Sequence, residues 1–216
     1  MSPYPLTQAY FFAFEGLDGS GKTTQARLLA DRLGSALGEI PLLLSEPSLG
    51  PAGQEIRERV FRPGAALDPR EELRLFLADR AWDVENNILP ALRQGRHVII
   101  DRYSLSSVAY QGATGLISQE EIMEANLGFP KPKLTFLLEL SPAEAMGRVA
   151  SRSSRRDNYE TEEYLARVKG IYDSIKDETL IRLPAMDPEA ITHGHVLAAI
   201  ERQCPGLVTG LGQARP

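Results

Sequence analysis

Short apolar runs alternate with longer stretches of helical periodicity along this chain. A strand buried on both faces reads as a continuous apolar run, whereas a helix repeats its apolar residues every three or four positions. The runs lie at residues 9–14, 41–44, 97–101, 134–140 and 180–183. Because strands that alternate with helices are typical of parallel sheets, the pattern predicts an α/β protein with a mostly parallel sheet.

Helix start signals lie between these runs. Asp68 before Pro69 is a typical N-cap, and it predicts a long helix that reaches Gln94, with Pro90 kinking its last turn and Gly95 ending it. Other helices are predicted over 24–33 and 54–61, and from Ser118, Ser141, Thr161 and Asp187 onwards.

Length and composition narrow the class of protein. The chain has 216 residues, of which 43% are hydrophobic and 25% are charged, so one folded domain spanning 1–216 is expected. The net charge of −5 argues against binding to nucleic acid or to an anionic membrane surface. No apolar run approaches the roughly 18–20 residues of a membrane span. A single cysteine, Cys204, excludes an intrachain disulfide and favours a reducing, cytoplasmic location.

Two segments are predicted to be mobile. The polar, basic stretch 151–158 is the best candidate for a mobile insertion, and the glycine-rich tail 205–216 is expected to be flexible.

A glycine-rich motif follows the first apolar run and opens a helix. Residues 16–23 fit the pattern G-x-x-x-x-G-K-[ST], in which backbone N–H groups surround phosphate oxygens at a helix N-terminus. Lys22 is expected to reach the β and γ phosphates, and the Thr23 hydroxyl to ligate Mg²⁺. The alternative, a chance glycine-rich turn, is disfavoured by this strand-to-helix context. The expected phosphate-binding residues are Gly16, Leu17, Asp18, Gly19, Ser20, Gly21, Lys22, Thr23 and Thr24.

The motif indicates a nucleoside triphosphate but not the reaction, because switches, motors and small-molecule kinases share it. The chain is too short for a motor with accessory domains, and it lacks the guanine-reading motif N-K-x-D. A small-molecule kinase is the class that remains.

A second motif narrows this class. Residues 101–111 read D-R-Y-S-L-S-S-V-A-Y-Q, and residues 76–81 read F-L-A-D-R-A. Together with the P-loop, they closely resemble the thymidylate kinase family from Phe12 to about Leu183. The resemblance implies a three-layer P-loop NTPase fold with a five-stranded parallel sheet, a short mobile lid at about 148–160, and a homodimer packed through helices. It also implies that ATP and dTMP react to give ADP and dTDP, with Mg²⁺.

The family resemblance implies a role for each residue of the acceptor site that matches a position of the family motif. Arg102 faces the phosphate of dTMP, where a guanidinium can bind bidentately, and Arg57 is its second phosphate ligand. Asp18 accepts a hydrogen bond from the sugar 3′-hydroxyl. Asp101 holds Mg²⁺, and a turn aspartate is its alternative. Glu46 either holds a Mg²⁺-bound water or orients Arg102, and both readings stay open.

The resemblance also implies a base pocket. Phe76 stacks on thymine, and Arg80, one helical turn further on, hydrogen-bonds thymine O4 and selects against cytosine. Ser107 and Gln111 touch the base or line its pocket. Tyr110 packs against the deoxyribose, with a purely structural role as its alternative.

The lid is expected to supply the catalytic cation, because no arginine follows Asp18 in the P-loop. Basic residues cluster there at Arg148, Arg152, Arg155 and Arg156. One of the last three is the arginine expected to stabilise charge on the transferred phosphoryl group. A solvated basic loop is the alternative. Ser45 and Asn158 stand where the family often has arginine. They suggest a regulator that has lost turnover as one rival function. The other is a kinase of a different deoxynucleoside monophosphate or of a deoxynucleoside.

Overall fold

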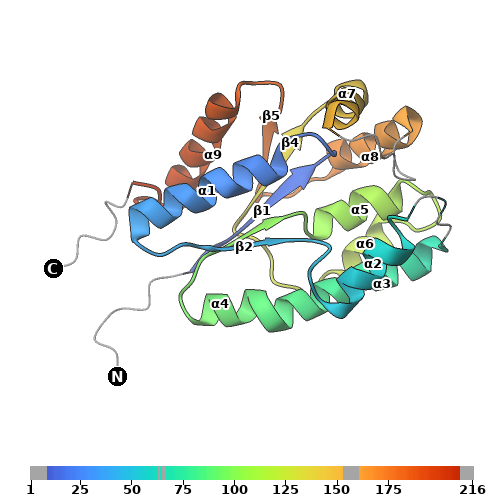
Figure 1. Ribbon diagram of the computed structural model, residues 1–216, viewed down its shortest axis with the longest axis horizontal. Coiled ribbons are helices and arrows are strands. Elements are labelled where there is room, and N and C mark those ends of the chain that lie inside the picture. Colours follow the sequence, from blue (N-terminus) through green and yellow to red (C-terminus); the bar gives the residue numbers. More distant parts are fainter. Residues whose placement is uncertain (1–8, 63, 65–66, 153–160, 210–216) are drawn as a thin grey trace.

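A five-stranded parallel sheet forms the centre of the protein (Figure 1). The computed structural model describes residues 9–62, 64, 67–152 and 161–209. Its strands are β1 (Phe11–Gly16), β2 (Leu42–Ser45), β3 (Val98–Asp101), β4 (Leu134–Glu139) and β5 (Leu180–Pro184). They are ordered β2-β3-β1-β4-β5, and every neighbouring pair is parallel. The sheet predicted from the apolar runs is confirmed.

The central strand explains why these runs are apolar on both faces. All six residues of β1 are buried. Phe12 and Phe14 belong to one core cluster, while Phe11 and Ala13 belong to a second. Since successive side chains of a strand point to opposite faces, β1 must supply apolar groups to both layers of helices.

Helices lie on both sides of the sheet, with α1 and α9 on one side and α3 with α4 on the other (Figure 1). Their bounds are α1 (Lys22–Leu37), α2 (Pro51–Arg59), α3 (Pro69–Asp83), η1 (Val84–Ile88), α4 (Leu89–Arg93), α5 (Ser104–Gly112), α6 (Gln119–Ala125), α7 (Pro142–Arg152), α8 (Glu162–Ser174) and α9 (Glu189–Gln203). Caps predicted from the sequence form at Asp68, Ser118 and Ser141, whose side chains accept backbone N–H groups.

The long helix predicted to reach Gln94 differs from the expectation in its middle. It is helical from Pro69 to Arg93, but residues 84–88 form a wide π-helical turn, η1, closed by the Leu89 N–H donating to the Val84 carbonyl. Pro90 follows directly and has no N–H to donate, so the ordinary hydrogen-bond ladder cannot continue through it. The deformation therefore precedes the proline rather than falling in the last turn.

Other boundaries also differ from the sequence-based predictions. The helix predicted over 54–61 starts earlier, at Pro51. The last helix has Pro188 rather than Asp187 at its N-cap, without a side-chain cap. Helix α5 is absent from the sequence-based predictions and overlaps the motif at residues 101–111. The predicted flexible tail starts too early at 205, because Leu207 and Val208 are buried in the core. Residues 210–216 of that tail lie outside the described residues.

The predicted lid region is helical at its beginning. Helix α7 includes Arg148 and ends at Arg152, and α8 begins at Glu162. Residues 153–160, with Arg155, Arg156 and Asn158, lie outside the described part of the chain. Within the described residues, no helix combines the length and the apolar character needed to cross a membrane.

Candidate active site

The glycine-rich loop connects the end of β1 to the start of α1, at the carboxyl edge of the sheet. Gly16 has a φ of 136°, and a Cβ there would lie 2.5 Å from the Leu138 carbonyl oxygen of the neighbouring strand. Gly21, the N-cap of α1, has a φ of 96°. Because side-chain-bearing residues rarely adopt these angles, the glycines allow the loop to wrap tightly around the helix N-terminus.

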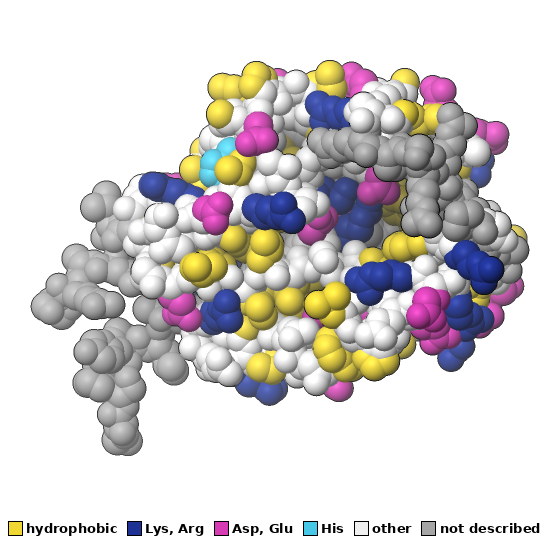
Figure 2. Space-filling view, viewed as in Figure 1, with side chains coloured by type: hydrophobic (Ala, Val, Ile, Leu, Met, Phe, Trp, Pro, Cys, Tyr) yellow, Lys and Arg dark blue, Asp and Glu magenta, His cyan; other side chains and the backbone are white. Residues whose placement is uncertain are grey.

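A cavity of about 230 Å³ opens over this loop. Lys, Arg, Asp and Glu side chains gather in a hollow on the face that Figure 2 shows. The cavity is lined by Asp18, Gly19, Gly21, Lys22, Thr23, Thr24, Ser45, Glu46, Asp101 and Arg102. Three carboxyl ends of neighbouring strands, β1, β2 and β3, thus contribute to one crevice, where α/β folds commonly bind ligands.

Lys22 is the buried cation of the cavity. Its Nζ donates a 2.8 Å hydrogen bond to the Leu17 carbonyl, and only 5% of the residue is exposed. Burial lowers the pKa of Lys22 to about 8, and the neighbouring Arg102 contributes to the decrease. A phosphate group that enters the cavity would favour the charged form of Lys22.

Asp101 and Thr23 both line the cavity and contact each other. The Thr23 hydroxyl donates to Asp101 Oδ2, while Asp101 Oδ1 is buried and has no hydrogen-bond partner among the described residues. A hydroxyl and a carboxylate oxygen suit a hard divalent cation such as Mg²⁺. The described residues contain no group of three or more His, Cys, Asp or Glu that could hold a metal.

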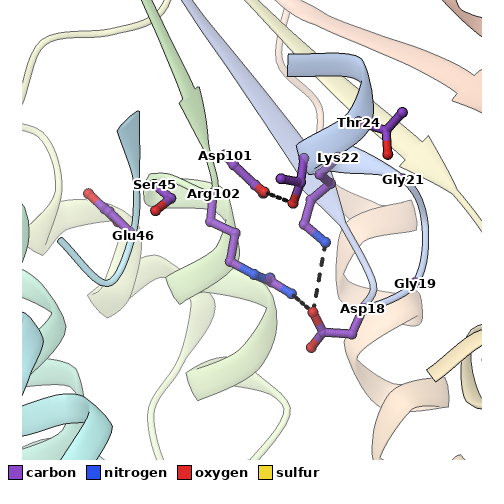
Figure 3. Close-up of a pocket in the computed structure, with 10 residues that line it drawn as sticks. Asp18, Gly19, Gly21, Lys22, Thr24, Ser45, Glu46, Asp101 and Arg102 are labelled. Atoms are coloured by element: carbon purple, nitrogen blue, oxygen red, sulfur yellow. Dashed lines mark hydrogen bonds and ion pairs between the residues drawn. The ribbon is translucent and has the colours of Figure 1, made fainter. Parts of the chain in front are cut away.

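Arg102 lies directly after β3 in a strained backbone conformation. Its φ of 70° falls in the left-handed region, which favours glycine. The guanidinium lies 2.6 Å from Asp18 Oδ1, and it stacks 5.0 Å above the centre of the Tyr110 ring. Figure 3 shows both Arg102 and Lys22 directed toward the Asp18 carboxylate.

Asp18 is the exposed acid between these two cations. Partial burial alone would raise its pKa, but Arg102 and Lys22 together lower the pKa to about 2. Asp18 is therefore ionised at neutral pH. Two cations thus converge on a single exposed carboxylate, which leaves positive charge available for an anionic ligand in the cavity.

Glu46 binds Arg80 rather than Arg102. Arg80 donates from Nε to Glu46 Oε1 at 3.0 Å and from Nη2 to Glu46 Oε2, so the pair is bidentate. In Figure 3 the Glu46 carboxylate points away from Arg102. The alternative in which Glu46 orients Arg102 by direct contact is therefore wrong. The other alternative, in which Glu46 holds a Mg²⁺-bound water, stays a prediction.

Arg80 is fully buried and has further protein partners. It donates to Asn126 Oδ1 and, at 3.2 Å, to Ser107 Oγ. Burial alone would lower the pKa of the guanidinium, but Glu46, aided by Tyr103 and Glu15, raises it above its ordinary value. The contact of Arg80 with a thymine base stays a prediction.

The other expected base-pocket residues do not line the cavity described above. Phe76 packs near Phe61, with their ring centres 6.4 Å apart. Gln111 is buried and donates to Glu72 at 2.7 Å. The structure therefore leaves their proposed contacts with a base as predictions.

Arg57 braces the loop that follows β2. It donates to the carbonyl oxygens of Pro47 and Ser48, at 2.5 and 2.6 Å. The Ser48 N–H and hydroxyl in turn donate to Asp79. Its role as a phosphate ligand is untested, but these contacts show that Arg57 holds the loop carrying Glu46.

The arginines of the predicted lid differ in how far they can be placed. Arg148 donates to the Gly19 carbonyl at 3.1 Å and to the Ala185 carbonyl at 3.0 Å, and so links the P-loop to the segment after β5. Arg152 ends α7, and Arg155 and Arg156 lie outside the described residues. Which of these three acts at the transferred phosphoryl group stays a prediction.

Sequence reasoning missed a buried acid behind the site. Glu15, the residue before the P-loop, accepts hydrogen bonds from the Tyr103 and Ser106 backbone N–H groups and from the Ser106 and Tyr172 hydroxyls. The available signal was an acidic residue at the end of an apolar strand, since buried carboxylates are rare unless they have partners.

Comparisons with known proteins identify relatives of this chain. A family model described as Thymidylate kinase matches residues 14–196. A probable thymidylate kinase of Pyrobaculum calidifontis is 39% identical over 91% of this chain and 98% of its own. A thymidylate kinase of Xanthomonas euvesicatoria pv. vesicatoria is 40% identical over 76% of this chain and 70% of its own. The solved thymidylate kinase of Candida albicans superposes with a TM-score of 0.78 at 26% identity, covering 90% of this chain and 92% of its own.

Proposed function

The chain belongs to the thymidylate kinase family, and we propose that it transfers the γ-phosphoryl group of ATP to dTMP, giving dTDP and ADP. The reaction would supply dTDP for dTTP synthesis. The observation that carries the proposal is the meeting of the P-loop, Asp101 and Arg102 around one cavity. Two phosphate-bearing ligands can approach each other there from opposite sides.

The P-loop side would bind the phosphates of ATP. Backbone N–H groups of the loop and the positive end of α1 favour anions, and Lys22 adds a full charge inside the cavity. Lys22 would exchange its hydrogen bond to the Leu17 carbonyl for one to a phosphate oxygen. Such fixed charges stabilise negative charge that builds up in the transition state.

Thr23 and Asp101 would hold Mg²⁺ together with phosphate oxygens and water. The unpartnered Asp101 Oδ1 supports this assignment, because a buried carboxylate oxygen without a partner is costly. The ion would neutralise phosphate charge during transfer. Before it binds, the Thr23 hydroxyl keeps Asp101 oriented toward the P-loop.

The Arg102 side of the cavity would bind the phosphate of dTMP. Arg102 can exchange its ion pair with Asp18 for a bidentate contact with phosphate oxygens. Asp18, once released, would accept a hydrogen bond from the sugar 3′-hydroxyl. Arg102 would then face the acceptor oxygen while Lys22 faces the donor, which aligns the two groups for in-line transfer.

The thymine base would lie on the side of Phe76, Arg80, Ser107, Tyr110 and Gln111. The family resemblance supports this, and so does the buried contact of Arg80 with Ser107. Arg57 would assist the acceptor phosphate. The lid would contribute a cation from Arg152, Arg155 or Arg156. We also propose, from the family resemblance, a homodimer and a cytoplasmic location.

A phosphorylation panel tests the proposal. The purified chain is given ATP, Mg²⁺ and either dTMP, dUMP, dCMP or thymidine, and the products are separated by chromatography. We expect dTMP to give dTDP at the highest kcat/KM. A preference for thymidine would instead indicate a deoxynucleoside kinase, and a preference for dCMP a different monophosphate kinase. Binding of ATP and dTMP without any product would indicate a regulator that has lost turnover.

A further inference from the structure

Glu15 is a fully buried carboxylate directly behind the candidate active site. It lies in β1, one residue before the P-loop motif, and its side chain is not among those lining the cavity. Its Oε1 accepts from the Tyr103 N–H at 3.0 Å and from the Ser106 N–H at 3.1 Å. Its Oε2 accepts from the Ser106 hydroxyl at 2.5 Å and from the Tyr172 hydroxyl at 3.1 Å.

These bonds make Glu15 an N-terminal cap for α5, supplied from another strand. The residue at the N-cap of α5, Tyr103, makes no side-chain cap hydrogen bond, and Glu15 accepts N–H groups at this helix end instead. A carboxylate at a helix N-terminus is favoured by the orientation of the peptide dipoles. The cap therefore holds the backbone immediately after Arg102, which is itself the residue with the strained φ.

Ser106 connects this cap to the Arg102 side chain. Both Glu15 oxygens act as acceptors, Oε1 for two backbone N–H groups and Oε2 for two hydroxyls, so the Ser106 hydroxyl donates its proton to Glu15. The Ser106 oxygen is then left as an acceptor, and Arg102 Nη1 donates to it at 3.2 Å. Because Glu15 acts as an acceptor, both hydrogen bonds have a fixed direction: Arg102 donates to Ser106, and Ser106 donates to Glu15.

The two ends of the guanidinium have different partners. Nη1 binds Ser106, while Nη2 donates to the Tyr110 hydroxyl at 3.3 Å and binds Asp18, whose side chain is 66% exposed. An incoming phosphate can displace the exposed Asp18 from Nη2 without displacing Ser106 from Nη1. Arg102 would therefore keep its support from Ser106 while its other end engages the ligand.

We propose that Ser106 and Glu15 are positioning residues that fix the Arg102 guanidinium for the acceptor phosphate. The inference rests on the proposed function, since it concerns the Arg102 side of the same cavity. Neither residue touches the reacting atoms. Loss of the Ser106 link should weaken the use of dTMP much more than the use of ATP, because Ser106 binds Arg102 whereas Lys22 binds the Leu17 carbonyl.

The variant Ser106→Ala removes the link while keeping the Ser106 N–H bond to Glu15. We expect the KM for dTMP to rise about tenfold, the scale of losing one hydrogen bond to a charged group. The KM for ATP should stay within twofold of its original value. Ser104→Ala, at the first residue of the same helix, is the matched control and should leave both constants within twofold.

The variant Glu15→Gln tests the hydrogen bond between Ser106 and Glu15. Its amide nitrogen would donate to the Ser106 oxygen and compete with Arg102 for that acceptor. We expect a rise in the KM for dTMP in the same direction as for Ser106→Ala. Since KM does not depend on the fraction of active enzyme, partial misfolding would lower the apparent kcat without mimicking this result. If Glu15→Gln yields no folded protein, Ser106→Ala decides the matter alone.

A rise of less than threefold in the KM for dTMP in Ser106→Ala overturns the inference. Equal rises for dTMP and ATP also overturn it, because they indicate a general loosening of the fold. If the unaltered chain makes no dTDP, both the proposed function and the inference fail. If it makes dTDP and Ser106→Ala behaves as the unaltered chain does, only the inference fails.

Discussion

Arg80 and Glu46 form a buried ion pair whose disruption should be visible as a loss of stability. Arg80 is 0% exposed and Glu46 is 6% exposed, and two parallel hydrogen bonds join them. Arg80→Ala would leave the Glu46 carboxylate buried without its cation. Removing one partner of such a pair costs about 3–5 kcal/mol. The lost bonds to Asn126 and Ser107 do not lower this expectation.

A loss of about 4 kcal/mol is a large part of the roughly 5–15 kcal/mol that stabilises a typical domain. Urea unfolding followed by circular dichroism measures it. The matched control is the double variant Glu46→Gln with Arg80→Met, which removes both charges and keeps the volume. We expect the double variant to lose much less stability than Arg80→Ala, because no isolated charge remains buried.

A loss of less than about 1 kcal/mol in Arg80→Ala, typical of an exposed pair, would refute this expectation. The expectation is also refuted if the double variant is as unstable as the single one. A stable Arg80→Ala protein with impaired use of dTMP alone would instead show that the arginine acts mainly at the base.

Lys22 and Asp83 carry buried ionisable groups whose removal has measurable effects. Lys22→Ala should lower kcat/KM by about 10³ in a coupled ADP assay, the scale of losing a major transition-state contact. The control variant Lys169→Ala, at an exposed side chain, should change kcat/KM little. A Lys22→Ala rate within tenfold of the unaltered chain would contradict this. Burial, aided by Asp79, raises the pKa of Asp83 from 3.8 to about 6, so the folded state holds the proton more tightly and stability falls as pH rises through this range. Between pH 5 and pH 8 the chain should lose about 1.4 kcal/mol of stability relative to Asp83→Asn, measured by urea unfolding, and a pH-independent difference between the two proteins would disprove the assignment.

The sheet and the P-loop could be predicted because their signals are local. The apolar runs are continuous where strands are buried on both faces, as in β1, and Gly16 to Thr23 form one contiguous motif. The position of Asp101 at a strand end also places it beside Thr23 once the strands are parallel. Each of these inferences needs only neighbours in sequence and one rule of sheet geometry.

The partners of the buried charges could not be predicted in the same way. Glu46 and Arg80 are 34 positions apart, and Glu15 and Ser106 are 91 apart. Whether a polar residue meets a ligand or another protein group depends on packing between distant elements, which periodicity does not encode. The wide turn at residues 84–88 was also missed, because Pro90 indicates a disturbed helix but not where the disturbance falls.

In the proposed reaction, the two phosphate-bearing ligands meet end to end in a single cavity. The most direct measurement is calorimetric titration with an analogue in which thymidine and adenosine are joined 5′ to 5′ through phosphates, in the presence of Mg²⁺. We predict one analogue bound per chain, much more tightly than ATP or dTMP alone, with both mononucleotides displaced. An analogue that binds no more tightly than ATP, and leaves dTMP binding unchanged, would contradict the account.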